Sequence, residues 1–255
     1  MIMHEEPRKV YYLFSPFLRI FHWTMVICIS FLFTTGLLIT KPASGGVSME
    51  PTFGNILLSL DLIRNIHFIA AFIFVAAFIL RIYGFVINKG DRLFPRVWKA
   101  EFWQSMIEVS MHYMLLKPSH RPYLRNPLAR MSYVGLYSMV FIEIFTGFAM
   151  YLMVNPNGFG AKFFGWTIGI FGSEFMIHLI HHYIAWAIML FVIGHVYMAI
   201  RADFMEREGE ISSMFSGVKI LEHEPVDVGE IMDKESSDTF SDRKPLHAGQ
   251  QETKM

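Results

Sequence analysis

Histidine is the residue type in this chain that could bind a redox cofactor. The 255 residues include eleven histidines but a single cysteine, Cys28. One cysteine excludes a disulfide framework, a cysteine-based zinc or iron–sulfur site and c-type haem attachment within this chain. Six histidines lie in or at the edge of long apolar segments, where ionisable residues are rare and usually functional: His22, His67, His178, His181, His182 and His195.

The spacing of His181 and His195 places both on one face of a helix. They are 14 residues apart, which is ~21 Å along a helix axis and returns to within ~40° of the same direction. By the same rule, His182 differs from His195 by ~140° and His178 by ~100°. Only His181 and His195 therefore point the same way into a bundle.

The segments that must position these histidines have the composition of membrane-spanning helices. The chain is 53% apolar and 17% charged, with a mean hydropathy of +0.38, whereas soluble domains carry about a quarter charged residues. A spanning helix needs about 20 mainly apolar residues, and four segments qualify: about 17–40, 64–87, 131–153 and 176–200. We expect an all-α membrane protein, a four-transmembrane-helix bundle whose first span is not a cleavable signal peptide.

The formal net charge of zero is the sum of two parts of opposite sign. Residues 1–202 carry 16 basic and 9 acidic side chains, while residues 203–255 carry 6 and 13. We expect a transmembrane domain over 1–202 and an acidic cytoplasmic tail over 203–255 that is flexible or folds on a partner. This charge distribution gives no indication of nucleic-acid binding.

Lysine and arginine in the short flanks predict the orientation of the spans. Nine of these residues fall between positions 81 and 130, and few lie in the loops on the opposite side. Both termini should therefore be cytoplasmic, in a multi-pass protein of the cell inner membrane. The pattern over 95–116 predicts an amphipathic helix at the cytoplasmic interface.

This topology groups four histidines into two pairs at matched depth. His22 and His195 lie near the cytoplasmic side, and His67 and His181 near the outer side. Each pair could hold one flat macrocycle between helices through axial imidazoles. Zinc is the competing interpretation, but two histidines per level are too few and we expect no carboxylate or thiolate at either depth. Two b-type haems are the better physical account. We then expect His178 and His182 to be structural or to lie near the propionates of the outer haem.

Glycines in two spans support this interpretation. Gly36 and Gly147, each preceded by threonine, lie towards the outer ends of the first and third spans. A residue without a side chain would let a porphyrin edge approach the backbone. Ordinary packing of helices through small residues is an equally good explanation.

Short motifs over about residues 11–220 carry a family resemblance. They are RIFHW at 19–23, NIH at 65–67 through RIY at 81–83, NPLAR at 126–130, HHYIAW at 181–186, GHVY at 194–197, and RAD at 201–203 to SSMFSG at 212–217. These stretches resemble the cytochrome b subunit of membrane-bound nickel–iron hydrogenases. That subunit falls within a wider bacterial cytochrome b561-like group, which includes the membrane subunits of formate dehydrogenase and thiosulfate reductase.

The resemblance implies two haems b with His22, His67, His181 and His195 as iron ligands, the set that depth had already selected. It also implies that the chain anchors a periplasmic hydrogenase, whose small iron–sulfur subunit and large nickel–iron subunit are its partners. Electrons would enter at the outer haem and leave from the inner haem to quinone, menaquinone or ubiquinone, near the cytoplasmic face.

Two alternatives stay open. The chain could serve a formate dehydrogenase, a thiosulfate reductase or another molybdenum oxidoreductase. A protein without redox function, such as a membrane anchor or a small transporter, is the second alternative. The histidines at two depths within four spans argue against it.

Two polar residues are candidates for quinone reduction. Asn126, at the cytoplasmic mouth of the third span, matches a polar residue near the quinone in related subunits, although Asn-Pro is equally typical of a helix start. Glu143 is the only formal charge deep in a span, ~18 Å into the helix. We expect it to be protonated and to face the bundle interior, in a proton path or, slightly preferred, bonded to a neighbouring helix.

Overall fold

The computed structural model describes residues 9–40, 59–87, 95–119, 121–155, 157–206, 209–221 and 225–227. Contacts divide the chain into two compact units. We call Pro16–Gly84 with Met131–Ala199 the membrane unit, and Met1–Ser15 with Phe85–Arg130 and Ile200–Met255 the flanking unit. Each unit is described by itself.

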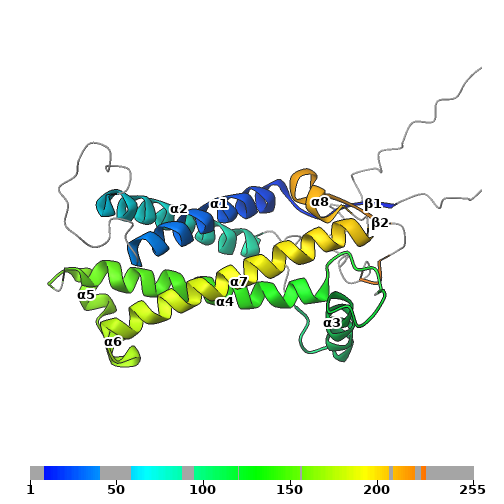
Figure 1. Ribbon diagram of the computed structural model, residues 1–255. Helices are drawn as coiled ribbons and strands as arrows, with labels where there is room; N and C mark the ends of the chain where they lie inside the picture. Colours follow the sequence, from blue (N-terminus) through cyan, green and yellow to red (C-terminus); the bar gives the residue numbers. More distant parts are fainter. Residues whose placement is uncertain are drawn as a thin grey trace, which may run out of the picture. The chain divides into compact units, whose positions relative to one another are not determined.

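Four long helices confirm the predicted all-α membrane architecture. They are α1 (Pro16–Thr40), α2 (Leu60–Ile87), α4 (Pro127–Met153) and α7 (Glu174–Glu206) (Figure 1). Each is long and apolar enough to cross a bilayer. The first three end at or next to the predicted residues, but α7 continues to Glu206, so the expected boundary at residue 202 falls inside a helix.

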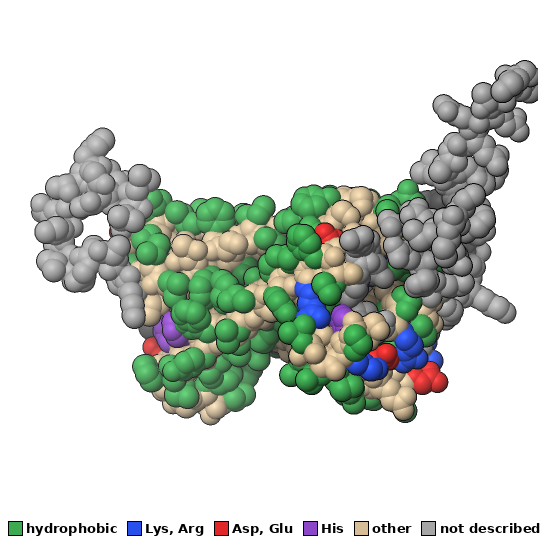
Figure 2. Space-filling view, turned by 45° about the vertical axis from the view of Figure 1, so that its right-hand side comes forward, with side chains coloured by type: hydrophobic (Ala, Val, Ile, Leu, Met, Phe, Trp, Pro, Cys, Tyr) green, Lys and Arg blue, Asp and Glu red, His purple; other side chains and the backbone are tan. Residues whose placement is uncertain are grey.

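A small apolar core joins the four helices within the membrane unit. All four contribute to it, through Met25, Cys28, Phe74, Phe78, Val140 and Ile188. Many other apolar side chains on these helices are exposed, and Figure 2 shows hydrophobic side chains over much of the visible surface. A helix that is apolar all round is suited to lipid on its outer side.

Two short helices connect α4 to α7. They are α5 (Phe159–Phe164) and α6 (Trp166–Phe171), and the latter ends at Gly172, whose φ of 85° suits glycine. The rings of Phe164 and Trp166 pack on Phe145 of α4 at centroid distances of 5.5 and 5.3 Å. These contacts tie the connection to the end of the span.

The flanking unit contains a small sheet that the sequence analysis did not predict. Strand β1 (Lys9–Tyr12) pairs antiparallel with β2 (Val218–Leu221), with Lys9 opposite Leu221 and Tyr12 opposite Val218. The short helix α8 (Glu210–Ser216) precedes β2 and ends at Gly217, which has a φ of 82°. Residues 210–221, expected in the acidic tail, thus form regular structure against the N-terminal segment.

Helix α3 (Ala100–Tyr113) lies within the predicted amphipathic segment and also belongs to the flanking unit. It buries Phe102, Val109 and His112, while Trp103 and Ile107 are exposed. The helix itself is as expected, and its location at the membrane interface remains a prediction.

Candidate functional site

A cavity of about 380 Å³ lies among the four long helices of the membrane unit. Its wall includes His67 of α2, His181 of α7 and Glu143 of α4, and most of the other lining residues are apolar. Cavities of this size and lining are typical of sites for small molecules and cofactors. The structure thus brings three of the predicted site residues to one place.

His67 makes a hydrogen bond to a threonine through its Nδ1. Thr35 of α1 lies with Oγ1 2.8 Å from His67 Nδ1, and this hydroxyl donates its hydrogen to the carbonyl of Phe31 at 2.6 Å. A hydroxyl has one hydrogen, so with that hydrogen on the carbonyl, Oγ1 accepts from His67 Nδ1–H. The lone pair then lies on Nε2, the form of imidazole that ligates a metal.

His181 of α7 makes the same kind of contact with a threonine of α4. Thr146 of α4 donates to the carbonyl of Ile142 at 2.7 Å, and its Oγ1 lies 2.9 Å from His181 Nδ1. With the hydroxyl hydrogen on that carbonyl, His181 also carries its hydrogen on Nδ1 and has its lone pair on Nε2. Such outer hydrogen bonds, which hold a ring and its tautomer, are usual for metal-ligating histidines.

Glu143 adds a second acceptor to His181. Its Oε2 lies 2.7 Å from His181 Nδ1, and its side chain is 12% exposed. The expectation that no carboxylate lies at either histidine depth is therefore wrong. One turn separates Glu143 from Thr146, so the two side chains project from one face of α4 towards the same ring. The expected bond to a neighbouring helix is present.

The two threonines are followed by glycines that lie against the same imidazoles. A Cβ added at Gly36 would be 3.8 Å from His67 Cε1, and one added at Gly147 would be 3.4 Å from His181 Cε1. Both glycines line the cavity. The sequence analysis noted that a threonine precedes each glycine but gave the threonines no role, although the repeated Thr-Gly pair was the signal that could have indicated one.

His22 and His195 form a second pair within the membrane unit. Their ring centroids are 6.3 Å apart with the planes at 62°, and His195 stacks on Phe191. Two imidazoles on opposite sides of one metal ion, with bonds of about 2 Å, would have centres roughly 6 Å apart. His22 Nδ1 is buried without a hydrogen-bond partner among the described residues.

The other two histidines of α7 use their nitrogens within their own helix. His182 Nε2 accepts a hydrogen bond of 3.2 Å from Trp186 Nε1, and His178 Nδ1 donates to the carbonyl of Glu174 at 3.0 Å. Both also line the cavity. The bond from Trp186 occupies the nitrogen that His182 would need for a metal, which agrees with the expected structural role.

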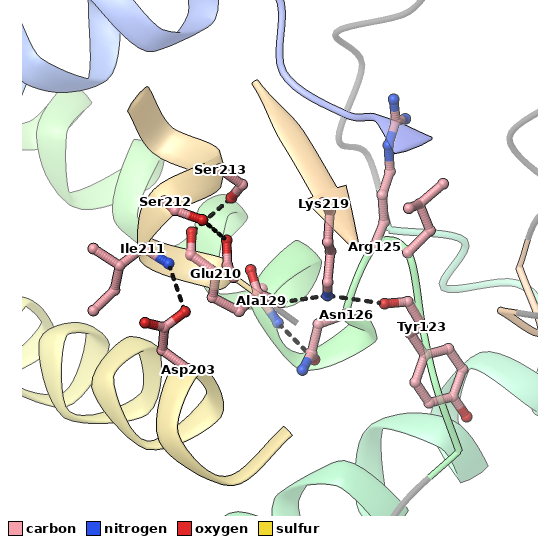
Figure 3. A network of polar contacts seen from close by, with 12 residues as sticks. Tyr123, Arg125, Asn126, Ala129, Asp203, Glu210, Ile211, Ser212, Ser213 and Lys219 are labelled. Carbon is pink, nitrogen blue, oxygen red and sulfur yellow. Dashed lines mark hydrogen bonds and ion pairs between the residues drawn. The ribbon is translucent and has the colours of Figure 1, made fainter. Parts of the chain in front are cut away.

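Asn126 lies in the flanking unit and caps helix α4. Its Oδ1 accepts hydrogen bonds from the amides of Leu128 at 2.9 Å and Ala129 at 3.4 Å, and Pro127 occupies the first helical position (Figure 3). Its Nδ2 lies 3.5 Å from the hydroxyl of Tyr113. The side chain thus has the helix-start role that Asn-Pro indicated.

Beside Asn126, the polar groups of the flanking unit bond to one another. Lys219 of β2 is 2% exposed, pairs with Glu210 and donates to the carbonyl of Tyr123 at 3.3 Å (Figure 3). Asp227 accepts from the amides of Leu124 at 2.7 Å and Arg125 at 2.8 Å. These bonds hold Glu210, Lys219 and Asp227 to the segment before α4.

Charges on the surface of the flanking unit also pair. Glu108 of α3 accepts from Arg121 Nε at 3.1 Å and from Lys117 Nζ at 3.4 Å. Although desolvation acts to raise the pKa of Glu108, these two cations lower it below its ordinary value. Arg201 donates to the carbonyls of His112 and Tyr113 and so caps the end of α3.

The donor set fits a haem better than a bare metal ion. Within the described residues, no group of three or more His, Cys, Asp and Glu side chains could hold a metal ion. The membrane unit instead offers pairs of histidines, glycines beside one pair and an apolar cavity. These are the features that axial ligation of a flat macrocycle requires.

Comparison with known proteins agrees with this geometry. Residues 13–217 match the family model described as prokaryotic cytochrome b561. The chain is 36% identical over 219 residues to the "Probable Ni/Fe-hydrogenase 1 B-type cytochrome subunit" of Escherichia coli (strain K12), covering 82% of this chain and 90% of the relative. It is 34% identical to the "Probable Ni/Fe-hydrogenase B-type cytochrome subunit" of Cupriavidus necator, covering 83% and 87% of the two chains.

A third relative, from Rhizobium leguminosarum bv. viciae, bears the same name and is 31% identical over 84% of this chain and 90% of its own length. The matched region contains all four spans and the four paired histidines. The chain therefore belongs to the prokaryotic cytochrome b561 family.

Proposed function

We propose that this chain is the membrane-anchoring dihaem cytochrome b subunit of a nickel–iron hydrogenase, and that it passes electrons from H₂ oxidation to the quinone pool. The observation that carries the proposal is the matched pair of Thr–His hydrogen bonds at the cavity. Each bond engages Nδ1 and supports a role for Nε2 as the iron ligand.

Four histidines would hold the two haems. His67 and His181 ligate the haem on the outer side, where the cavity and both glycines lie. His22 and His195 ligate the haem on the cytoplasmic side, and their ring separation suits a shared metal. Each haem supplies one-electron redox chemistry, and the protein supplies orientation, a dry surrounding and fixed charges.

The names of the relatives support a hydrogenase as the partner. We propose that the small iron–sulfur subunit docks on the outer side and carries the large nickel–iron subunit. The distribution of lysine and arginine supports an inner-membrane location with both termini cytoplasmic. This orientation places the outer histidine pair nearer the periplasmic partner.

We place quinone reduction at the cytoplasmic end, with Asn126 as a candidate contact. Its Oδ1 caps α4, so only its Nδ2 could donate to a quinone oxygen, and Tyr113 lies beside this group. Menaquinone and ubiquinone both present such an oxygen. Substitution of Asn126 by Asp keeps the capping oxygen and removes the amide donor, so it should slow quinone reduction without lowering haem content.

Haem counting and co-purification test the proposal. The full chain should purify from membranes with two b-type haems per polypeptide in a pyridine haemochrome assay, together with a nickel–iron large subunit and an iron–sulfur small subunit. Membranes should reduce a soluble quinone with H₂, and deletion of the chain should abolish this activity. Absence of b-type haem would overturn the proposal. Co-purification with a molybdenum enzyme would retain the cytochrome and reassign its partner.

A further inference from the structure

We propose that an exposed apolar surface of the flanking unit docks on the lipid bilayer, where it contacts acyl chains and anionic phospholipid headgroups. This apolar surface consists of residues on helix α3 and on either side of it: Trp98, Trp103, Ile107 and Met114–Leu116. The inference goes beyond the proposed function and does not depend on the haems. It assigns a lipid contact to residues outside the four spans.

Helix α3 has apolar side chains on two sides, and only one side is buried. Phe102 and Val109 are buried, whereas Trp103 and Ile107 are exposed and lie one turn apart on the other side of the helix. Trp103 Nε1 donates to the carbonyl of Val97 at 2.8 Å, so the polar group of the indole has a partner and its ring is available for apolar contact. The protein already covers the side with Phe102 and Val109, which leaves the side with Trp103 and Ile107 for lipid.

Three consecutive apolar side chains follow the helix and are strongly exposed. Met114, Leu115 and Leu116 are 70%, 75% and 73% exposed. They lie in a turn that closes the helix, because the Leu115 amide donates to the carbonyl of His112 at 3.0 Å and the Leu116 amide to that of Met111 at 2.9 Å.

Leu115 occupies the position of this turn that glycine usually takes. Its φ is 66°, in the left-handed region that strains a bulky residue. Among the described residues it is the one non-glycine with a positive φ. Glycine would relieve the strain, so local folding does not account for a leucine here. Contact of its exposed side chain with lipid does.

Basic side chains border the apolar surface. Lys117 follows Leu116 directly, and both Lys117 and Arg121 pair with Glu108 of α3. The side chains of the two cations are 44% and 51% exposed, against 17% for the carboxylate, so the positive charge is the more accessible. Residues 95–121 carry four basic and two acidic side chains. An apolar surface with a positive border suits a bilayer that carries anionic headgroups.

The chain enters the membrane on both sides of this surface. Residues 88–126 connect α2 to α4, and both helices are long and apolar enough to cross a bilayer. A segment that joins two consecutive spans begins and ends at the same membrane surface, so the apolar surface is tethered near lipid at two points. Tryptophan is enriched at the headgroup level of membranes. These features favour lipid over a soluble protein as the occupant.

Nitroxide labels on the full chain, reconstituted in vesicles of phosphatidylcholine and phosphatidylglycerol, test the inference. The labels are attached to Ile107→Cys, Leu116→Cys and, as the matched control, Glu101→Cys. Glu101 is exposed on α3 and lies ~120° around the helix from Ile107. Cys28 is buried, and the unsubstituted chain is the labelling blank. Labels at 107 and 116 should collide mainly with oxygen, which concentrates in lipid, whereas the label at 101 should collide mainly with nickel(II) ethylenediaminediacetate, which stays in water.

Leu115→Gly separates lipid contact from local folding. The substitution relieves the strain at this position, so a purely structural role predicts unchanged collisions at Ile107→Cys. Docking on lipid predicts that the ratio of oxygen to nickel collisions falls. Leu115→Met keeps an apolar side chain and should retain the ratio. Replacement of phosphatidylglycerol by phosphatidylcholine should lower it, because the basic border loses its anionic partners.

The outcomes distinguish lipid from the other occupants. If nickel collisions dominate at 107 and 116, water covers the surface, and if both reagents collide rarely there, protein covers it; either result overturns the proposal. An unchanged ratio in Leu115→Gly would exclude the role of Leu115, and an unchanged ratio without phosphatidylglycerol would exclude the role of anionic headgroups. Haem content, which tests the proposed function, should be equal in all these variants, so the two proposals fail separately.

Discussion

The membrane unit and the flanking unit both bury polar side chains, but they satisfy them differently. In the flanking unit, Lys219 bonds to Glu210 and Tyr123, and Asp227 bonds to two backbone amides. In the membrane unit, the side-chain hydrogen bonds of His67 and His181 to described residues involve Nδ1, and both histidines line a cavity.

This difference separates structural from functional polar groups. Buried polar groups usually find partners within the protein, since an unsatisfied one costs roughly 1–3 kcal/mol. A network that closes on itself stabilises a fold. A network that fixes two imidazole rings beside a cavity can instead hold a ligand. We therefore expect substitutions in the flanking unit to change stability and substitutions in the membrane unit to change haem binding.

The largest effect should come from the paired histidines. Replacement of His67 or His181 by alanine should remove the outer haem, and replacement of His22 or His195 should remove the inner one, because each iron loses an axial ligand. Haem per polypeptide, measured by pyridine haemochrome, should fall from two to one. His182→Asn is the matched control in α7 and should keep both haems, since His182 Nε2 is already bonded to Trp186. If His182→Asn lost haem, or if the His22 and His67 variants lost the same haem, the assignment of the two histidine pairs would be wrong.

In the flanking unit, Asp227→Ala should destabilise without affecting haem. Two buried amides, of Leu124 and Arg125, would lose a charged acceptor, at a cost of roughly 3 kcal/mol. Hydrogen exchange at these two amides should accelerate on the order of 100-fold, and the haem spectrum should stay unchanged. Asp227→Asn keeps one acceptor and should have an intermediate effect. A changed haem spectrum would show that the two networks are not separable.

A smaller effect is expected at the threonines that orient the imidazoles. Thr35→Val and Thr146→Val keep the side-chain shape and remove the acceptor from His67 or His181. Loss of such an outer hydrogen bond typically costs 10–100-fold in metal affinity. The outer haem should dissociate about tenfold faster in detergent, with Thr146→Val the milder change because Glu143 still holds His181. Thr→Ser at either position should behave as wild type, and equal loss of the inner haem would contradict the assignment.

The smallest effect concerns the surface charges of α3. Because the folded-state pKa of Glu108 is lowered by Arg121 and Lys117, its stabilising contribution is fully present above the ordinary glutamate pKa of about 4.3. It is lost as the pH falls through the lowered value. Exposed pairs contribute about 0.2–1 kcal/mol, so residues 114–119 should gain only modest hydrogen exchange in acid. Glu108→Gln should remove this pH dependence, and an unchanged dependence in the variant would exclude Glu108 as its source.

The sequence predicted the spans and the histidine pairs because both follow from simple periodicity. Long apolar segments need no tertiary information, and a 14-residue spacing determines which side chains share a helix face. The residues that it missed are Thr35 and Thr146, whose roles depend on contacts between different helices. Glu143 was recognised as unusual, but its partner could not be known until α4 and α7 were packed together.

The small sheet was missed for a related reason. Strands of four residues carry little pattern, and β1 and β2 are separated by nearly the whole chain. Composition over 203–255 indicated an acidic tail, yet Lys219 and Asp227 within it make buried bonds to residues before α4. A local charge average conceals such individual contacts.

The pairing of β1 with β2 has a consequence for biosynthesis. A ribosome makes Lys9–Tyr12 first, but their partners, Val218–Leu221, emerge only after every span has been translated. The N-terminal strand must therefore wait, with its backbone hydrogen bonds made to water, until insertion is finished. Completion of this sheet would mark a chain whose four spans have all been synthesised, and a product truncated before Val218 could not form it.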